Sequence, residues 1–225
     1  LVATVQALKH HGGDPEGGVQ ALERGAANLA ANLAIVERFG LQAVVAVNRH
    51  PDDTPAEIHA AQRLAVEAGA FGTAVNEGYL EGGAGAAALA ETVAAAAERA
   101  LPVQFLYGDE EPLADKIEKV ARGAYGAERI ELSPVAAKQA AELEARGLGR
   151  LPVCIAKTHL SLSHDPTLVN APEGFTLPVR ELRAYTGAGW VVALCGEMQT
   201  MPGLPADAAA SRIDVEADGR VVGLR

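Results

Sequence analysis

The sequence has little of several residue types that would place it in a class at once. Only two cysteines, Cys154 and Cys195, occur among 225 residues. Two cysteines are too few for a disulfide framework and fit a reducing compartment, so we expect a cytoplasmic protein. Both lie in apolar, strand-like stretches. We therefore expect them to be small buried hydrophobic residues rather than nucleophiles.

Basic residues are also scarce. The 19 lysines and arginines are outnumbered by 29 aspartates and glutamates, which gives a formal net charge of −10. A nucleic-acid binder presents a basic face, so we expect neither a nucleic acid nor an acidic membrane surface as a partner. No apolar run reaches the length of a membrane span, and no secretory signal pattern opens the sequence.

Common catalytic and nucleotide-binding motifs are missing as well. The phosphate loop G-x-x-x-x-G-K-[ST] and the nucleophile elbow G-x-S-x-G are both absent from the sequence. None of the six histidines belongs to an H-E-x-x-H or C-x-x-C…H pattern, so we expect no metal site. The nearest glycine-rich segment, Gly187 to Gly189, precedes a strand-like run rather than a helix. That order favours a tight turn, with a ligand contact as the alternative.

The first hundred residues alternate between helical and strand-like patterns. Thr54, Pro55 and Glu57 form a helix start signal, with a threonine cap, a proline at the first position and a glutamate three after the cap. Such alternation predicts an α/β fold in which helices flank a parallel sheet. The predicted elements are a short β-rich piece over 1–13, helices over about 19–36, 54–69 and 84–100, and strands over 41–47 and 70–75.

The second half of the chain does not continue the alternation of helices and strands. An Asp218-Gly219 turn between two short apolar runs predicts a hairpin over 213–222. We therefore expect two domains, an α/β domain over 1–105 and a mixed α+β domain over 106–225. Besides the hairpin, the elements predicted for 106–225 are helices over about 112–121 and 133–147 and strands over 153–156, 175–183 and 190–194.

Ligands of open parallel sheets bind beyond the carboxyl ends of the strands, here residues 48–53 and 76–83. His50 is the histidine that follows a predicted strand, and Tyr79 follows the next one. Aromatic residues make up only 4% of the chain, so a ring at such a position is unusual. A flat ring there can stack on a planar ligand; a simple packing contact is the alternative for Tyr79.

The opening segment, V-A-T-V-Q-A-L-K-H-H-G-G over 2–13, resembles a signature of the formate–tetrahydrofolate ligase family. The usual form is V-A-T-[IV]-R-A-L-K-x-[HN]-G-G, so Gln6 replaces an arginine and His11 is one of two usual residues. The run T-M-P-G-L-P over 200–205 is a second specific match. Further similar segments extend the resemblance over the whole chain.

The resemblance implies a P-loop-NTPase-like ligase of which this chain is the internal and C-terminal part. Family members are more than twice as long, and their N-terminal part carries the phosphate loop. The start at Leu1 rather than Met fits that interpretation. ATP with Mg is implied as co-substrate, mainly bound by the N-terminal part, and tetrahydrofolate as substrate. No prosthetic group, no metal and no catalytic residue is expected in this portion, and a homotetramer is expected.

In the family, two aromatic rings sandwich the pterin, one from an N-R-F-P turn and one from an E-x-W segment. The matching residues here are Asn48, Arg49, His50 and Pro51, and then Tyr79; His50 replaces phenylalanine and Tyr79 replaces tryptophan. By the same resemblance, Val75 lines the folate pocket. Lys157, Thr158, Gly187 and Gly189 also lie in matching segments, as interdomain or nucleotide-side contacts.

The leading interpretation is therefore the folate-binding part of a ligase that makes 10-formyltetrahydrofolate from formate, ATP and tetrahydrofolate through formyl phosphate. The N-terminal part of the same enzyme would be its partner. Without the phosphate loop, the isolated chain is expected to be inactive. Two alternatives stay open: a non-catalytic folate-binding module, and one subunit of a split ligase.

Overall fold

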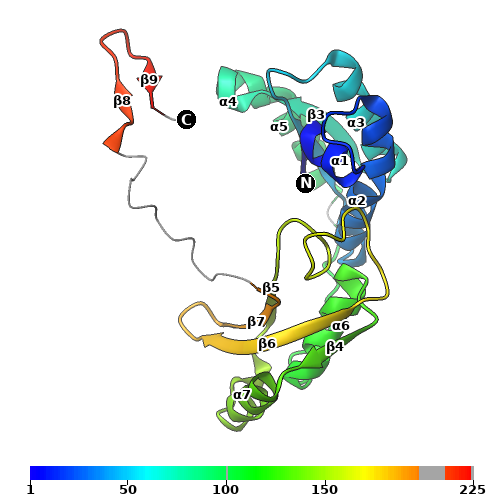
Figure 1. The fold of residues 1–225 in the computed structure, drawn as a ribbon, viewed down its shortest axis with the longest axis vertical. Helices are drawn as coiled ribbons and strands as arrows, with labels where there is room; N and C mark the ends of the chain where they lie inside the picture. Colours follow the sequence, from blue (N-terminus) through cyan, green and yellow to red (C-terminus); the bar gives the residue numbers. More distant parts are fainter. Residues whose placement is uncertain (100, 198–210, 224–225) are drawn as a thin grey trace.

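The computed structural model describes residues 1–99, 101–197 and 211–223 (Figure 1). Over these residues the chain builds two separate sheets, each with its own helices and its own hydrophobic cluster. The α/β fold, with a parallel sheet flanked by helices and a mixed α+β C-terminal part, is as predicted from the sequence. Within the described ranges, no helix combines the length and the apolar character that crossing a membrane requires.

The first sheet is parallel and has the order β1-β2-β3. Its strands are β1 (Val2–Ala3), β2 (Val44–Asn48) and β3 (Gly72–Asn76). β2 and β3 are paired residue for residue, from Val44 opposite Gly72 to Asn48 opposite Asn76. The two strands therefore end level with each other, at the same edge of the sheet.

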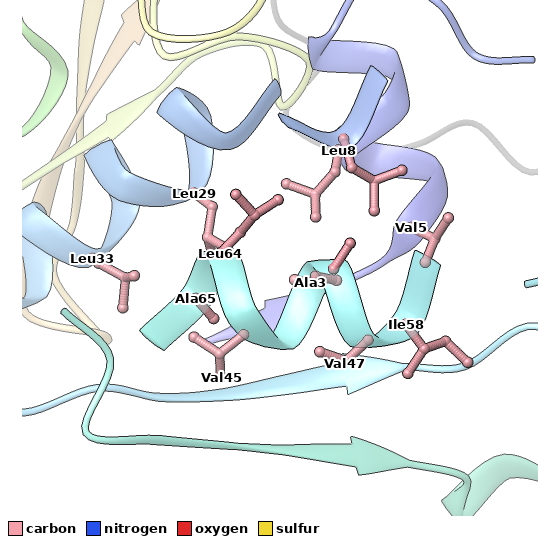
Figure 2. Close-up of a cluster of buried hydrophobic side chains, with 13 residues drawn as sticks. Ala3, Val5, Leu8, Leu29, Leu33, Val45, Val47, Ile58, Leu64 and Ala65 are labelled. Atoms are coloured by element: carbon pink, nitrogen blue, oxygen red, sulfur yellow. The ribbon is translucent and has the colours of Figure 1, made fainter. Parts of the chain in front are cut away.

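Three helices pack together on β2. They are α1 (Val5–His11), α2 (Val19–Arg38) and α3 (Pro55–Glu67). Their apolar side chains form one buried cluster with Val45 and Val47 of β2 (Figure 2). α1 approaches α2 so closely that a Cβ on Gly25 would lie 2.0 Å from the carbonyl oxygen of Leu8. Only glycine fits at such a crossing.

α3 begins as its sequence predicts. The Thr54 hydroxyl accepts a hydrogen bond from the Glu57 backbone N–H, and the Glu57 carboxylate accepts one from the Thr54 backbone N–H. This capping box satisfies N–H groups that the helix leaves free at its start. Glu57 is buried and also meets Lys9 of α1, with 2.7 Å between Nζ and Oε1. The cap thus ties α3 to α1.

After β3 the chain forms α4 (Gly78–Glu81), a 3-10 turn (Ala84–Ala86) and α5 (Ala87–Ala97). α5 packs against β3 and β2. α4 is a single turn, and all four of its residues lie outside the buried core. It was not predicted, because four residues are too few to show a helical period.

The second sheet is mixed, with the order β4-β6-β7-β5. β6 and β7 are antiparallel, whereas β4 runs parallel to β6 and β5 parallel to β7. α6 and α7 pack on this sheet around a second buried cluster. The elements are α6 (Leu113–Tyr125), β4 (Arg129–Leu132), α7 (Pro134–Ala145), a 3-10 turn (Leu148–Arg150), β5 (Val153–Ala156), β6 (Thr176–Tyr185) and β7 (Trp190–Cys195).

The hairpin predicted near the C-terminal end is confirmed. β8 (Asp214–Val215) pairs antiparallel with β9 (Val221–Val222), and Gly219 in the turn has a φ of +86°. The T-M-P-G-L-P run over 200–205 lies outside the described residues. The division at 105/106 stays a prediction, although the two hydrophobic clusters lie on either side of it.

Two expectations were wrong. The segment 1–13 is mostly helical, because Thr4 caps α1 and its apolar residues Val5 and Leu8 are buried on one side. Cys195 is buried as expected, but Cys154 is exposed. β5 is an edge strand of the second sheet, and its side chains alternate between two faces. Val153 and Ile155 pack on the cluster, so Cys154 points the other way.

One residue of the second half forms hydrogen bonds with helices of the first half. Asn170 lies in the loop between β5 and β6 and has a left-handed backbone, with a φ of +69°. Its Oδ1 accepts a hydrogen bond from the Asn28 N–H, and its carbonyl oxygen accepts one from Asn28 Nδ2. Its Nδ2 donates to the Arg24 carbonyl, and its backbone N–H donates to His11 Nδ1. A single residue thus reaches both α1 and α2.

Candidate functional site

A pocket of about 350 Å³ opens where β2 and β3 end. It lies at the carboxyl edge of the parallel sheet, where ligands of such sheets bind. The lining residues come from the segment after β2 and from the end of β3 with α4, and they are Asn48, Arg49, His50, Pro51, Asn76, Tyr79 and Leu80.

The floor of the pocket is a pair of asparagines. Asn48 and Asn76 are opposite each other in the sheet, and Asn76 Nδ2 donates a hydrogen bond of 2.7 Å to Asn48 Oδ1. Asn76 Oδ1 accepts a hydrogen bond of 3.2 Å from the backbone N–H of Gly78, the first residue of α4. The two strand ends and α4 are therefore linked by side-chain amides.

Arg49, which lines the pocket, forms an ion pair with Glu77. Arg49 Nη1 lies 2.7 Å from Glu77 Oε1, and both side chains are partly exposed. The Arg49 backbone N–H also donates to the Asn76 carbonyl oxygen at 3.2 Å, which continues the pairing beyond the ends of the strands. An exposed pair of this kind contributes little to stability, so its main effect here is to orient the two side chains.

The two rings belong to different segments. His50 lies in a turn that the Asp53 carboxylate fixes by accepting a hydrogen bond of 2.8 Å from the His50 N–H. Tyr79 lies on α4, and 83% of its surface is exposed. A tyrosine ring in a globular protein is normally covered on at least one side, so an uncovered ring that lines a pocket is available to a flat ligand.

Five of the six residues proposed for folate binding therefore line one pocket: Asn48, Arg49, His50, Pro51 and Tyr79. Val75 is outside the lining. It is paired with Val47 and packs against the buried cluster under the helices. Asn76 and Leu80 also line the pocket but were not singled out as site residues. The asparagine that directly follows each predicted strand was a usable signal for Asn76, whereas nothing in the sequence marks Leu80.

The other matching residues lie in the second half of the chain. Lys157 follows β5, and its ammonium group donates to the carbonyl oxygens of Thr158 and Ser161. It also lies 4.7 Å from the centre of the Tyr125 ring. Burial lowers the pKa of Lys157 to about 8. These contacts close the 157–161 loop on itself and on α6.

Gly187 and Gly189 form the turn between β6 and β7. Gly189 has a φ of +81°, and its N–H donates to the Tyr185 carbonyl oxygen at 2.8 Å. The segment is therefore a tight hairpin turn. Neither glycine lines the pocket at the end of β2 and β3. Within the described part of the chain, no three His, Cys, Asp or Glu side chains gather as metal ligands would.

The whole chain, residues 1–225, matches the family described as formate–tetrahydrofolate ligase. It is 46% identical to a formate–tetrahydrofolate ligase of Herpetosiphon aurantiacus, 47% to one of Roseiflexus sp. and 48% to one of Saccharopolyspora erythraea. All of this chain is covered in each comparison, and it spans 42% of the length of each relative. The chain belongs to the formate–tetrahydrofolate ligase family.

Proposed function

We propose that this chain is the folate-binding part of a formate–tetrahydrofolate ligase. In the full reaction, ATP phosphorylates formate to formyl phosphate, the tetrahydrofolate amine attacks the formyl carbon, and phosphate leaves as 10-formyltetrahydrofolate forms. Formate is a poor acyl donor, and the phosphate supplies the leaving group. The part that falls to this chain is to hold the pterin flat beside that intermediate, which is positioning work.

The observation that supports this proposal is the convergence of two rings on one pocket. His50 and Tyr79 come from neighbouring strand ends and line the same space of about 350 Å³. A pterin is planar, and aromatic rings attract planar ligands by offset stacking. Pro51 adds a rigid apolar surface beside His50. Arg49 and Glu77 orient each other at the side, where a ligand tail with charged groups would leave the pocket.

The remaining steps fall to residues outside this chain. Because the sequence has no phosphate loop, ATP with Mg and formyl phosphate are held by the rest of the enzyme. The isolated chain is therefore expected to bind tetrahydrofolate without turning it over. In the complete enzyme we expect a cytoplasmic homotetramer.

The test is calorimetric titration of the chain with tetrahydrofolate, under anaerobic conditions. Saturable binding is expected, and His50→Ala and Tyr79→Ala should each weaken it about tenfold because each removes one stacking surface. His59→Ala and Tyr185→Ala are matched controls. They remove the same two ring types from α3 and from β6, and neither residue lines the pocket.

Two results would contradict the proposal. One is saturable binding that all four variants leave unchanged, which would put tetrahydrofolate elsewhere. The other is the absence of binding by the chain and by a His50→Phe variant, which restores the usual family ring. ATP-dependent turnover by the chain alone would contradict the proposal that ATP and formyl phosphate bind to the rest of the enzyme.

A further inference from the structure

We propose that the side-chain amide of Asn48 recognises the edge of the pteridine ring by a hydrogen bond. Its Nδ2 donates to the ring carbonyl of a 4-oxo pteridine, and the site thereby rejects 4-amino pteridines. This inference rests on the proposed folate site and adds a specificity-determining residue to it. It follows from the hydrogen bonds that fix which way the two floor asparagines face.

The first step concerns Asn76. A backbone N–H can only donate a hydrogen bond, so the side-chain atom that meets the Gly78 N–H must be an oxygen. The orientation of the Asn76 amide is therefore set by the start of α4. Its oxygen faces Gly78, and its NH2 group faces Asn48.

The second step concerns Asn48. An NH2 group can also only donate, so the Asn48 atom that meets it at 2.7 Å must be the oxygen. The remaining atom, Asn48 Nδ2, has no hydrogen-bond partner among the described residues. Asn48 lines the pocket. Its two N–H donors are thus left for the ligand.

The third step concerns which polar groups at the floor of the pocket already have a protein partner. The carboxylate next to it, Glu77, is engaged by Arg49. Asn76 Oδ1 is engaged by Gly78. Asn48 Nδ2 is thus the floor atom that makes no hydrogen bond to any described residue, and it can only donate. A donor that faces the pocket favours a ligand that presents a carbonyl, and an amino group in the same place leaves two donors facing each other.

Asn76 is a positioning residue in this scheme. It touches α4 through Gly78 and holds the Asn48 amide in one orientation. The same residue therefore links the polar floor to the helix that carries Tyr79. Changing Asn76 should alter ligand preference without any change in the group that touches the pteridine.

The test compares a 4-oxo tetrahydropteridine with its 4-amino analogue by calorimetry; the two differ at ring position 4 and, as a consequence, in the proton on N3. We expect the chain to bind the 4-oxo ligand about tenfold more tightly, because its ring carbonyl accepts a hydrogen bond from Asn48 Nδ2 that a 4-amino group cannot accept. Asn48→Asp keeps the bond from Asn76 and offers the ligand an acceptor. We expect it to reverse the preference.

Asn76→Asp is the second variant. An aspartate still accepts from Gly78 but no longer donates to Asn48, so the Asn48 amide turns round to donate to the new carboxylate. The Asn48 oxygen then faces the ligand, and the preference should also reverse. Gln42→Glu is the control, because it adds the same charge at an exposed residue that precedes β2, away from the pocket.

The outcomes are distinct. Reversal in both aspartate variants, with the control unchanged, supports the assignment. Binding with the same ligand preference in all variants overturns the role of Asn48 and leaves the folate site standing. Failure of both the parent chain and its His50→Phe variant to bind either pteridine overturns the folate site and the assignment with it. If one aspartate variant does not fold, as judged by circular dichroism, the other decides.

Discussion

His11 Nδ1 accepts a hydrogen bond of 2.9 Å from the backbone N–H of Asn170, a residue 159 positions further along the chain. To accept, that nitrogen must carry no proton. Burial, and then the neighbouring His10, lowers the pKa of His11 and keeps the ring neutral. The family pattern allows histidine or asparagine at this position, and both supply an uncharged acceptor. The contact therefore requires an uncharged acceptor at position 11.

The contact predicts a pH dependence. The pKa of His11 is lower in the folded chain than the ordinary value of 6.5, so its contribution to stability is present above that value and is lost as the pH falls through the folded pKa. Hydrogen exchange of the amides near Asn170, followed against pH, should show the loop loosening in acid. His11→Asn should abolish that dependence. An unchanged profile in His11→Asn would show that another group controls the loop.

Asn170 should be costly to replace. Asn170→Gly keeps the left-handed backbone but loses the two hydrogen bonds made by the side chain, at a cost of about 2 kcal/mol. Asn170→Ala should cost about 1 kcal/mol more, because alanine disfavours a positive φ. Denaturant unfolding measures both changes. Asn32→Ala, which removes an asparagine bonded only within α2, is the control. Equal losses for glycine and alanine would mean that the backbone there is not strained.

The buried pair of Lys9 and Glu57 should dominate the acid behaviour of the first sheet. Lys9, then the Thr54 backbone N–H, holds the pKa of Glu57 at about 2, against an ordinary 4.5. The stabilisation is complete above the ordinary value and disappears as the pH falls through about 2. Lys9→Met should raise the pKa of Glu57 and cost about 2 kcal/mol, the worth of a hydrogen bond to a charged group. Carboxyl titration by NMR gives the first quantity and urea unfolding the second.

Lys157 should be an unusually reactive amine. Its pKa of about 8 means that about half of it is neutral at that pH, whereas an ordinary lysine stays charged. Because the folded pKa lies below the unfolded one, its contribution to stability increases as the pH rises from about 8 towards 10.5. Mild acylation at pH 8, read by peptide mass spectrometry, should modify Lys157 ahead of Lys138, an exposed residue of α7. Equal labelling of the two lysines would contradict the lowered pKa.

His50→Phe should strengthen binding of tetrahydrofolate. Phenylalanine offers the pterin a larger apolar face than imidazole, and it has no ring nitrogen to strip of water on stacking. We expect a gain of about three- to tenfold, within the range of one aromatic contact. Calorimetry of the chain with tetrahydrofolate measures it, with His59→Phe as the control. Weaker binding by His50→Phe would mean that the imidazole makes a polar contact with the ligand.

Much of this architecture could be predicted from local signals. The capping residues of α3, the apolar period of α2 and the Asp218-Gly219 turn each depend on a few neighbouring residues, and each is found where the sequence places it. The pocket was predictable in outline for the same reason. Parallel strands end at one edge, so whatever follows β2 and β3 must lie close together.

What could not be predicted depends on long-range pairing. The face on which Val75 lies is set by its pairing with Val47, and that register is invisible in either strand alone. Cys154 is exposed because it lies on the face of β5 opposite to the buried cluster, and which face the helices cover depends on tertiary packing. The contacts of Asn170 join residues far apart in sequence, and a lone asparagine in a loop gives no sign of them.

Because β2 and β3 end at paired residues, the site should tolerate some mutations during evolution better than others. Exchanging the ring at His50 or Tyr79 alters the surface offered to a ligand but leaves its position intact. Inserting or deleting one residue in either strand turns every later side chain to the opposite face, and so separates Asn48 from Asn76. Relatives of this chain should therefore drift in the identity of the two rings while the lengths of the two strands stay constant.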